Sequence, residues 1–491
     1  MRLSPLDLAI IAVYLAGITL FGLRFRKRQR SMRDYFLADR NIPWWAIALS
    51  IVAAETSTLT IISSPGLAYD SNLTFLQVVM GYLVGRIIIS FVLLPHYFRG
   101  DLYTAYQLIE RRFGPQLRTV TSALFLLTRA AAEGVRVYAV SIVVSIALGT
   151  GEIASIAIIT LLTLIYTFEG GLAAVIWTDV VQTFIYVGGT FVGLFTILHL
   201  VPGGWSSVHD IADTFHKFQV FDAPIGPQFP YLDLSKPYTL WAGIIGGAFF
   251  ITASHGTDQL IVQRLLAARS QRQSTLALLS SGAVILFQFG LFLLAGVMLF
   301  AYYQAPSSAF GKADRIYPTF IVTHMPRGIA GLLIAAILAA AMSNLSAALN
   351  SLSTSSMVDF YLRLRPSTDE RLRMRLSRWL TVFWAIILFG LALLSRRGGR
   401  VLELGLSIAS VAYGAMLGVF LLGILTKRAN ALGAFAGMAC GLALNLFLWL
   451  APDLTKQLSG FTVAWTWYVT LGTIVTFTIG YMVSLLATKH D

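Results

Sequence analysis

The stretch SIVAAETSTLT, residues 50–60, decides the fold of this chain. It places Glu55 and several hydroxyl groups in the middle of an apolar segment that is long enough to cross a membrane. Helical spacing cannot put all of these polar groups on one face, so some point elsewhere or the helix opens here. An opened helix frees backbone carbonyls, which are good ligands for a hard cation such as Na⁺. The alternative is a continuous helix whose hydroxyls bond back to the preceding turn, with Glu55 paired to an arginine.

The composition is that of an integral membrane protein. Of the 491 residues, 57% are hydrophobic and 12% are charged, whereas a soluble protein carries about 25% charged residues. The apolar residues come in blocks of about 20, the length of a helix that spans a bilayer. The formal net charge of +13 does not indicate a nucleic-acid partner, because the basic residues gather in short loops such as 24–33. The single cysteine, Cys440, excludes an intrachain disulfide.

We therefore predict an all-α integral membrane protein with about thirteen transmembrane helices. An odd number of spans puts the two ends on opposite sides, and the distribution of Lys and Arg predicts an N-terminus outside and a C-terminus in the cytoplasm. The basic run 396–400, which this scheme places outside, is the exception. The predicted location is the inner cell membrane. The predicted spans are 5–23, 43–67, 74–97, 119–148, 152–168, 173–201, 239–263, 274–303, 328–360, 377–395, 402–426, 432–451 and 464–487.

Further polar clusters lie inside the predicted spans, where ionisable groups usually face a cavity or a partner. Asp179 stands early in its span and is interpreted either as an ion ligand or as a cap near the interface. In 338–356, small and polar residues repeat at helical spacing, which indicates either close helix packing or a row of oxygen ligands. This stripe consists of Ala340, Ser343, Asn344, Ala347 and Asn350.

Charged residues also follow helical spacing in TRAAAEGVR, residues 128–136. Glu133 is spaced to pair with both Arg129 and Arg136, so one guanidinium is left over in charge. If Arg136 faces a cavity, it suits a carboxylate substrate, which it can bind with two hydrogen bonds. Otherwise the three side chains form a structural ladder.

A second candidate for a broken helix contains SHGTDQLIVQR, residues 254–264. Glycines and polar groups share this span, with His255 and Asp258 near its middle. His255 is interpreted either as a satisfied core residue or as a ligand.

These features together resemble the sodium:solute symporter family, which includes sodium/glucose and sodium/proline transporters. The resemblance implies an inverted-repeat leucine-transporter-type core of five plus five helices, within a single transport domain over residues 1–491. The repeats would cover 43–201 and 239–426, with an extra N-terminal helix and loop in 1–42 and two C-terminal helices in 432–491. The resemblance lies in YFLADRNIPWWAIALSIVAAE (35–55), GYLVGR (81–86), YTFEGGLAAVIWTDVVQ (166–182), GTDQLIVQRLLAARS (256–270) and LNSLSTSSMVDFY (349–361).

The resemblance also implies where sodium binds. In the principal site, Asn344 stands where the family usually has Ser or Thr, so proton coupling through Glu55 or Asp179 is an alternative. In a possible second site, Ala347 stands where a serine is expected. The principal site would use the carbonyls of Ala53, Thr56 and Ala340 and the side chains of Ser343 and Asn344, and the second site Asp179, Ser343 and Ser346.

We therefore expect a secondary active transporter, not an enzyme, that couples Na⁺ to a small organic solute with carboxylate-bearing solutes favoured by Arg136. Its partners would be the solute and the lipid bilayer, with no organic cofactor, nucleic acid or obligate protein partner. A proton-coupled or sodium-independent transporter on the same fold and a membrane solute sensor are the alternatives. The predicted substrate-binding residues are Glu55, Ser57, Thr58, Thr60, Gln77, Arg136, Ser254, His255 and Asp258.

Overall fold

The computed structural model is almost entirely helical in the parts of the chain that it describes. Within the described residues, one isolated parallel β-bridge pairs Ile42, just before the first broken helix, with Ala268, just after the second. The described residues are 3–23, 41–99, 105–166, 172–222, 233–361, 364–365, 367, 370–397 and 400–487. The basic loop 24–33 lies outside them, as do parts of the stretches 35–55, 166–182 and 396–400.

The helices follow one another with short connections. The first half contains α1 (Pro5–Leu23), α3 (Trp44–Glu55), α4 (Thr58–Asp70), α5 (Leu76–Ile88), the π-helical turn η3 (Ile89–Leu93), α6 (Leu94–Phe98), α7 (Tyr106–Phe113), α8 (Pro115–Leu148), α9 (Glu152–Tyr166), α10 (Leu172–Leu200) and α11 (Gly204–Thr214). The second half contains the π-helical turn η4 (Ala242–Gly246), α12 (Gly247–Gly256), α13 (Gln259–Leu266), α14 (Gln271–Tyr303), the turns η5 (Ser307–Phe310) and η6 (Ala313–Arg315), α15 (Ile316–His324), α16 (Ile329–Ser355), η7 (Ser356–Tyr361), α18 (Glu370–Ser395), α19 (Val401–Leu425), α20 (Ala431–Leu450), α21 (Pro452–Ser459), η8 (Trp465–Trp467) and α22 (Tyr468–Ala487).

Each of the thirteen predicted spans coincides with one or more of these helices, with ends that differ by up to two turns. Among the described residues, eight helices are long and apolar enough to cross a membrane, or nine if the bent pair α3–α4 counts as one span. Shorter apolar stretches of helix cover Pro5–Ile18, Glu152–Leu161, Ala242–Gly256 and Trp379–Ser395. The all-α class is therefore confirmed, and the number of thirteen spans stays a prediction.

The second predicted span is a broken helix. Its two halves, α3 and α4, meet at Thr56 and Ser57 and are bent by 64° relative to each other. The Ser57 amide, which would donate to the Ala53 carbonyl in a continuous helix, donates instead to the Glu55 carbonyl at 3.0 Å. The opening predicted from the polar run 50–60 is therefore present.

A second break follows the glycine-rich segment. A π-helical turn, η4, leads into α12, which ends at Gly256, and α13 begins at Gln259, after two intervening residues. Asp258 starts α13 as its N-cap, because its side chain accepts a hydrogen bond from the Leu260 amide at 2.9 Å. The break at residues 257–258 thus lies within the stretch 254–264 that we singled out as a candidate.

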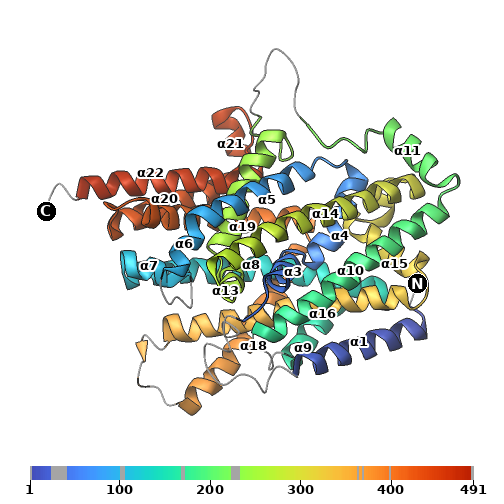
Figure 1. The fold of residues 1–491 in the computed structure, drawn as a ribbon, viewed down its shortest axis with the longest axis horizontal. Coiled ribbons are helices and arrows are strands. Elements are labelled where there is room, and N and C mark those ends of the chain that lie inside the picture. The colour runs from blue at the N-terminus through green and yellow to red at the C-terminus, as the bar shows by residue number, and fades with distance from the viewer. Residues whose placement is uncertain are drawn as a thin grey trace.

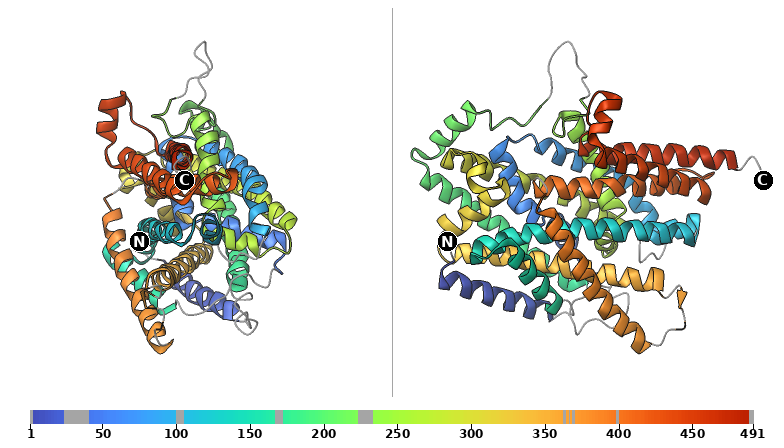
Figure 2. Two further views of the ribbon diagram at one scale, coloured as in Figure 1. Left: turned by 90° about the vertical axis from the view of Figure 1, so that its left-hand side faces the viewer. Right: turned by 180° about the vertical axis from the view of Figure 1, so that it is seen from behind.

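Figures 1 and 2 show most of the long helices running roughly along the long axis of the molecule. The broken pair lies centrally: α3 packs against α10 and α14, and α4 packs against α8, α14 and α19. At the periphery, α1 packs on α16, and α20 and α22 pack together against α19. The start of α1 and the end of α22 lie at opposite ends of the molecule (Figure 1).

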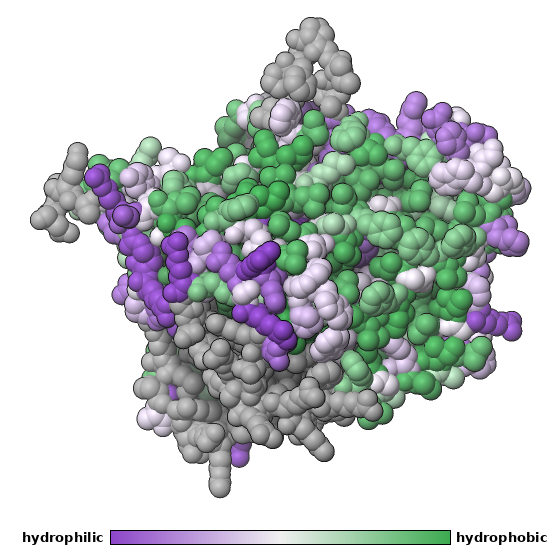
Figure 3. All heavy atoms as spheres, viewed as in Figure 1, coloured by the Kyte–Doolittle hydropathy of each residue, from purple (hydrophilic) through white to green (hydrophobic). Residues whose placement is uncertain are grey.

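The outer surface is apolar between the two ends. Figure 3 shows a broad hydrophobic band, with hydrophilic side chains gathered towards both ends of the long axis. Large apolar side chains stand outward from the molecule, among them Phe91, Phe184, Phe195 and Ile386, each at least 65% exposed. Surfaces of this kind are rare on soluble monomers and suit the lipid phase, in which helices keep their backbone groups paired internally.

Candidate functional site

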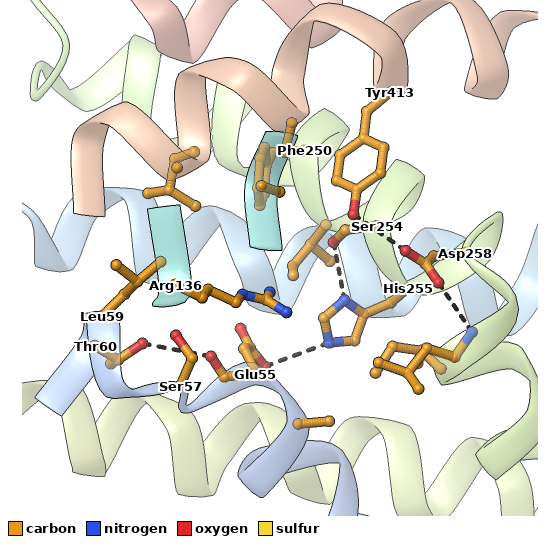
Figure 4. A pocket seen from close by; sticks show the side chains of 18 of the residues that line it. Glu55, Ser57, Leu59, Thr60, Arg136, Phe250, Ser254, His255, Asp258 and Tyr413 are labelled. Carbon is orange, nitrogen blue, oxygen red and sulfur yellow. Dashed lines mark hydrogen bonds and ion pairs between the residues drawn. The ribbon is translucent and has the colours of Figure 1, made fainter. Parts of the chain in front are cut away.

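A cavity of about 130 Å³ lies beside the two breaks. That volume is many times what one buried water needs. Its walls come from the junction of α3 and α4, from α8, from α12 and α13, and from α19 (Figure 4). The polar residues on these walls are Glu55, Ser57, Thr60, Tyr82, Thr128, Arg129, Arg136, Ser254, His255, Asp258 and Tyr413.

Glu55 is paired with an arginine although the helix opens, so only the arginine pairing of the continuous-helix alternative holds. One carboxylate oxygen, Oε2, forms an ion pair with Arg86 and lies 3.3 Å from His255 Nε2. The Arg86 side chain is fully buried, and its guanidinium also donates to Ser281 and to the Tyr82 carbonyl. The other oxygen, Oε1, is buried and has no hydrogen-bond partner among the described residues.

The charged cluster on α8 extends beyond this helix, whereas the spacing in 128–136 predicted pairs within it alone. Glu133 Oε1 pairs with both Arg129, at 3.0 Å, and Arg136, at 2.6 Å. Arg129 Nη1 also lies 3.8 Å from Asp258, at the second break, and Asp258 in turn accepts from the Tyr413 hydroxyl at 3.2 Å. The charge left over on α8 is thus balanced by a carboxylate from another helix.

Arg136 is the accessible member of this cluster. Its side chain is 27% exposed, compared with 10% for Arg129 and 1% for Glu133. It lines the main cavity and also a second, much smaller pocket behind it. In Figure 4 its guanidinium points into the cavity, over Glu55 and Ser57 and towards His255.

Of the predicted principal sodium ligands, Asn344 lies where α16 passes the break between α3 and α4. The Ala53 carbonyl is released from the helical ladder because the Ser57 amide is turned away from it. Asn344, on α16, lines the small pocket together with Ser57 and Thr58, and Thr58 Oγ1 is buried without a partner among the described residues. Ala340 is buried one turn earlier on α16. The Ser343 side chain lies outside the described residues, as do those of Ala347 and Asn350.

Asp179, predicted for a second sodium site, has two described partners. Its Oδ2 accepts from the Ser50 hydroxyl at 2.6 Å and forms an ion pair with Arg264 Nη2 at 3.2 Å. Arg264 also donates to Ser50 at 2.9 Å, so the three side chains form a closed triangle. Ser346 lies partly buried on α16 and is in no described bond with Asp179.

Two predicted substrate residues lie elsewhere than the main cavity. Gln77 is fully buried, and its amide is engaged by the Tyr238 carbonyl, at 2.8 Å, and by the Asp222 amide, at 3.4 Å. It therefore ties α5 to the start of the second broken helix and is not among the cavity-lining residues. Thr58 lines the small pocket only.

Several residues near the site were not predicted. Gln288, on α14, donates to the Thr56 hydroxyl at 2.7 Å, and an amide inside the apolar span 274–303 was a signal for it. Phe250 lies between Tyr82 and Tyr413, at ring distances of 6.0 and 5.8 Å, and forms an aromatic wall. Aromatic residues are common in apolar spans, so no sequence signal singled out this trio.

The family assignment follows from comparison with known proteins. The model of the sodium:solute symporter family matches residues 35–441, which includes both breaks and the cavity. The chain belongs to the sodium:solute symporter family. It is therefore a sodium-coupled secondary active transporter and not an enzyme, and Na⁺ is its coupling ion.

Relatives with an assigned solute cover nearly the whole chain. A sodium/sialic acid symporter of Proteus mirabilis is 31% identical over 88% of this chain and 87% of its own length. A sodium/sialic acid symporter of Aliivibrio fischeri is 28% identical over 98% and 93%. The human sodium/iodide cotransporter is 27% identical over 91% of this chain and 69% of its own length.

Solved structures confirm the leucine-transporter-type fold. The substrate-bound outward-open state of a Na⁺-coupled sialic acid symporter superimposes with a TM-score of 0.82, at 29% identity and 98% coverage of both chains. Mhp1, a nucleobase-cation-symport-1 family transporter in a closed conformation, gives a TM-score of 0.54 at 13% identity, which bears on the fold alone.

Proposed function

We propose that this symporter carries a small organic carboxylate together with Na⁺ and holds the carboxylate with Arg136. The observation that supports this is the partial exposure of the Arg136 side chain inside the cavity, next to ion pairs whose other side chains are at most 10% exposed. Guanidinium groups bind carboxylates with two parallel hydrogen bonds, and Arg136 Nη1 uses only part of its donor capacity on Glu133. Ser57 and Thr60, at the broken helix, would contact the same solute.

Sodium would bind at the junction of the first broken helix with α16. In this proposal the carbonyls of Ala53, Thr56 and Ala340 provide hard oxygen ligands. The hydroxyl of Ser343 and the side-chain oxygen of Asn344 complete the set. The released Ala53 carbonyl and the position of Asn344 beside Ser57 support it. A second sodium ion at Asp179 and Ser346 would have to share the Asp179 carboxylate with Arg264.

Transport would follow from ligands that prefer particular conformations. Na⁺ bridging α16 to the broken helix would order the opened backbone and favour the state that accepts solute from outside. Na⁺ and the solute would then be released on the cytoplasmic side, where the Na⁺ concentration is low. One Na⁺ with one monocarboxylate carries no net charge across the membrane, so the inward gradient of Na⁺ concentration, not the membrane potential, would supply the energy for accumulation.

We also propose the inner cell membrane as the location, with the N-terminus outside and the C-terminus in the cytoplasm. The opposite positions of the ends of α1 and α22 support an odd number of crossings (Figure 1). The division into repeats over 43–201 and 239–426, with one break in the first helix of each, remains part of this proposal.

The test is solute binding by the purified protein, followed as the rise in its unfolding temperature. Carboxylates, beginning with N-acetylneuraminate because two relatives are sialic acid symporters, would be compared in NaCl and in choline chloride. We expect stabilisation by a carboxylate only when Na⁺ is present. Equal stabilisation in choline would instead favour proton-coupled or sodium-independent transport.

The role of Arg136 is tested with a matched pair of variants. Arg136→Gln should weaken carboxylate affinity at least about tenfold, because a charge-assisted hydrogen bond is lost. The carboxylate affinity of Arg136→Lys should lie between those of wild type and Arg136→Gln, since lysine keeps the charge but cannot form two parallel hydrogen bonds. The stabilisation by Na⁺ alone serves as the control for folding, and unchanged solute affinity in both variants would contradict the proposal.

A further inference from the structure

The walls of the cavity around Arg136 are mainly apolar. Besides the polar residues named above, they consist of aliphatic and aromatic side chains from α4, α5, α8, α12, α13, α14 and α19. Apolar walls stabilise a solute whose body is also apolar, because both surfaces then leave water. The aromatic residues on the walls are Phe75, Tyr82, Phe125, Phe250, Phe289 and Tyr413.

Two sets of aromatic rings stand out in this lining. The Phe250 ring lies 6.0 Å from that of Tyr82, at an angle of 22°, and 5.8 Å from that of Tyr413, at 65°. The rings of Phe75 and Phe289 form a second pair, with centroids 5.4 Å apart. A further ring placed among such faces and edges would gain roughly two- to tenfold in affinity beyond the burial of its area.

Most of the polar side chains on the walls are already engaged within the protein. The Thr128 hydroxyl donates to a carbonyl one turn earlier on α8, at 2.7 Å. The Tyr413 hydroxyl donates to Asp258, and the Ser254 hydroxyl is bonded to His255 Nδ1 at 2.9 Å. A solute with many hydroxyl groups would lose its bonds to water here and find few partners in return. Each polar group buried without a partner lowers affinity by about five- to 150-fold.

The charged side chains in and beside the cavity are paired as well. Among the described residues, each carboxylate there has a guanidinium partner, so none is left for an ammonium group of the solute. An amino acid would bury its ammonium without a counter-charge, which is costly, whereas one Na⁺ and one monocarboxylate add no net charge. The pairs are Glu55 with Arg86, Asp258 with Arg129, and Glu133 with Arg129 and Arg136.

The cavity also has the size of a single ring. Its volume of about 130 Å³ is close to that of an engineered apolar cavity of about 150 Å³ that binds benzene. N-acetylneuraminate is much larger than benzene, so the cavity would have to expand to hold it.

We propose that the solute is a single-ring aromatic monocarboxylate of the benzoate class, with its carboxylate on Arg136 and its ring against Phe250. Figure 4 shows Phe250 and Tyr413 on one side of the Arg136 guanidinium and Ser57 on the other. This inference rests on the proposed transport of carboxylates. It narrows that proposal to acids with an apolar body, unlike the sialic acids that two relatives carry.

The experiment measures how tightly the purified wild-type protein binds matched carboxylates in NaCl. The affinity for each solute is obtained from the concentration dependence of the rise in unfolding temperature. Benzoate is compared with gallate, which carries hydroxyl groups on the same ring, and with N-acetylneuraminate. Phenylacetate is compared with phenylglycine, which adds an ammonium. We expect benzoate and phenylacetate to bind at least about fivefold more tightly than their polar counterparts.

A second arm tests the ring with the variant Phe250→Leu, which stays apolar but loses the aromatic face. The ratio of the affinities for benzoate and cyclohexanecarboxylate should fall by about two- to tenfold in this variant. The matched control is Phe91→Leu, at a side chain exposed on the outer surface, which should leave the ratio unchanged. Stabilisation by Na⁺ without solute reports folding, and Phe289→Leu takes the place of Phe250→Leu if that variant does not fold.

The outcomes separate this inference from the proposed function. If gallate or N-acetylneuraminate binds as tightly as benzoate, or phenylglycine as tightly as phenylacetate, the inference is overturned while carboxylate transport stands. If the affinity ratio is the same in the cavity variant and in Phe91→Leu, the ring does not lie against the aromatic wall, and the inference is again overturned. If no carboxylate stabilises the protein in Na⁺, the proposed function itself fails.

Discussion

Arg264 and Asp179 form a buried ion pair that ties the two broken helices to α10. Arg264 Nη2 lies 3.2 Å from Asp179 Oδ2, and the side chains are 3% and 9% exposed. Ser50, on α3, bonds to both. Because α3 precedes the first break and α13 follows the second, these half-helices are held together on one side of the cavity. In the proposed orientation that side is cytoplasmic, and the triangle must open for release.

We predict that removing one partner of this pair opens the cytoplasmic side. Arg264→Gln leaves Asp179 buried without its cation, a change that costs about 3–5 kcal/mol in the state that contains the pair. A cysteine introduced as Ala409→Cys, on the cavity wall, with Cys440→Ser to remove the natural thiol, should react several-fold faster with a reagent added from the cytoplasmic side.

A double variant tests whether the effect comes from the pair. Asp179→Asn with Arg264→Gln removes both charges, so its unfolding temperature should lie above those of both single variants. If the double variant is no more stable than the worse single variant, or if labelling rates do not change, the two residues do not act as a gate.

A close approach of two helices predicts a different kind of loss. A Cβ atom added at Gly81, on α5, would lie 2.2 Å from the Gly243 carbonyl oxygen, which is backbone of η4. Gly81→Ala must therefore separate α5 from the second broken helix, at a cost of about 1–3 kcal/mol. The matched control is Gly290→Ala, where nothing lies within 4 Å and alanine should stabilise α14 by about 0.5–1 kcal/mol. Thermal unfolding of both variants tests whether Gly81→Ala lowers the stability and Gly290→Ala raises it.

Much of the fold and of the opened helix could be predicted because both depend on local patterns. Apolar blocks of about 20 residues specify spans without knowledge of their neighbours. The polar run around Glu55 cannot lie on one face of a helix, and the structure breaks there by 64°. The number of spans was harder, because four apolar stretches of helix are only 10–17 residues long, shorter than the roughly 20 residues of a full crossing.

The partners of the site residues could not be predicted, because they come from distant segments. Spacing within α8 assigns Glu133 to two arginines and leaves a positive charge, but Asp258, at the second break, balances it. Spacing likewise shows no partner for Asp179, whose cation Arg264 follows 85 residues later. Side-chain pairs across helices depend on the packing of whole helices, which one sequence does not show.

The first helix is fastened to α16 by one carboxylate, which gives a prediction about stability. Asp7 Oδ1 accepts from the Gly328 and Gly331 amides, at 2.7 and 3.0 Å, and so caps α16 from another helix. Asp7→Ala should lower the free energy of unfolding by about 1–2 kcal/mol. Asp7→Asn keeps an acceptor and should lose less, as thermal unfolding will show. Equal losses in both variants would mean that the charge, not the cap, matters.

A buried carboxylate in the loop before α15 predicts a dependence of stability on pH. Asp314 Oδ2 accepts from the Val401 amide at the start of α19, while its Oδ1 is buried without a partner among the described residues. Burial raises the pKa of Asp314 above its usual value of 3.8. The folded protein therefore binds this proton more tightly than the unfolded chain, so the contribution of Asp314 to stability falls as pH rises from the unfolded to the folded pKa and is constant above it. Asp314→Asn stays neutral, so the variant should be more stable than wild type near neutral pH. The difference in stability should vanish below the pKa of Asp314 in the unfolded chain.

Unfolding temperatures of the two proteins from pH 3 to pH 8 test this. A difference that is the same at every pH would show that the pKa of Asp314 is the same in the folded and unfolded states.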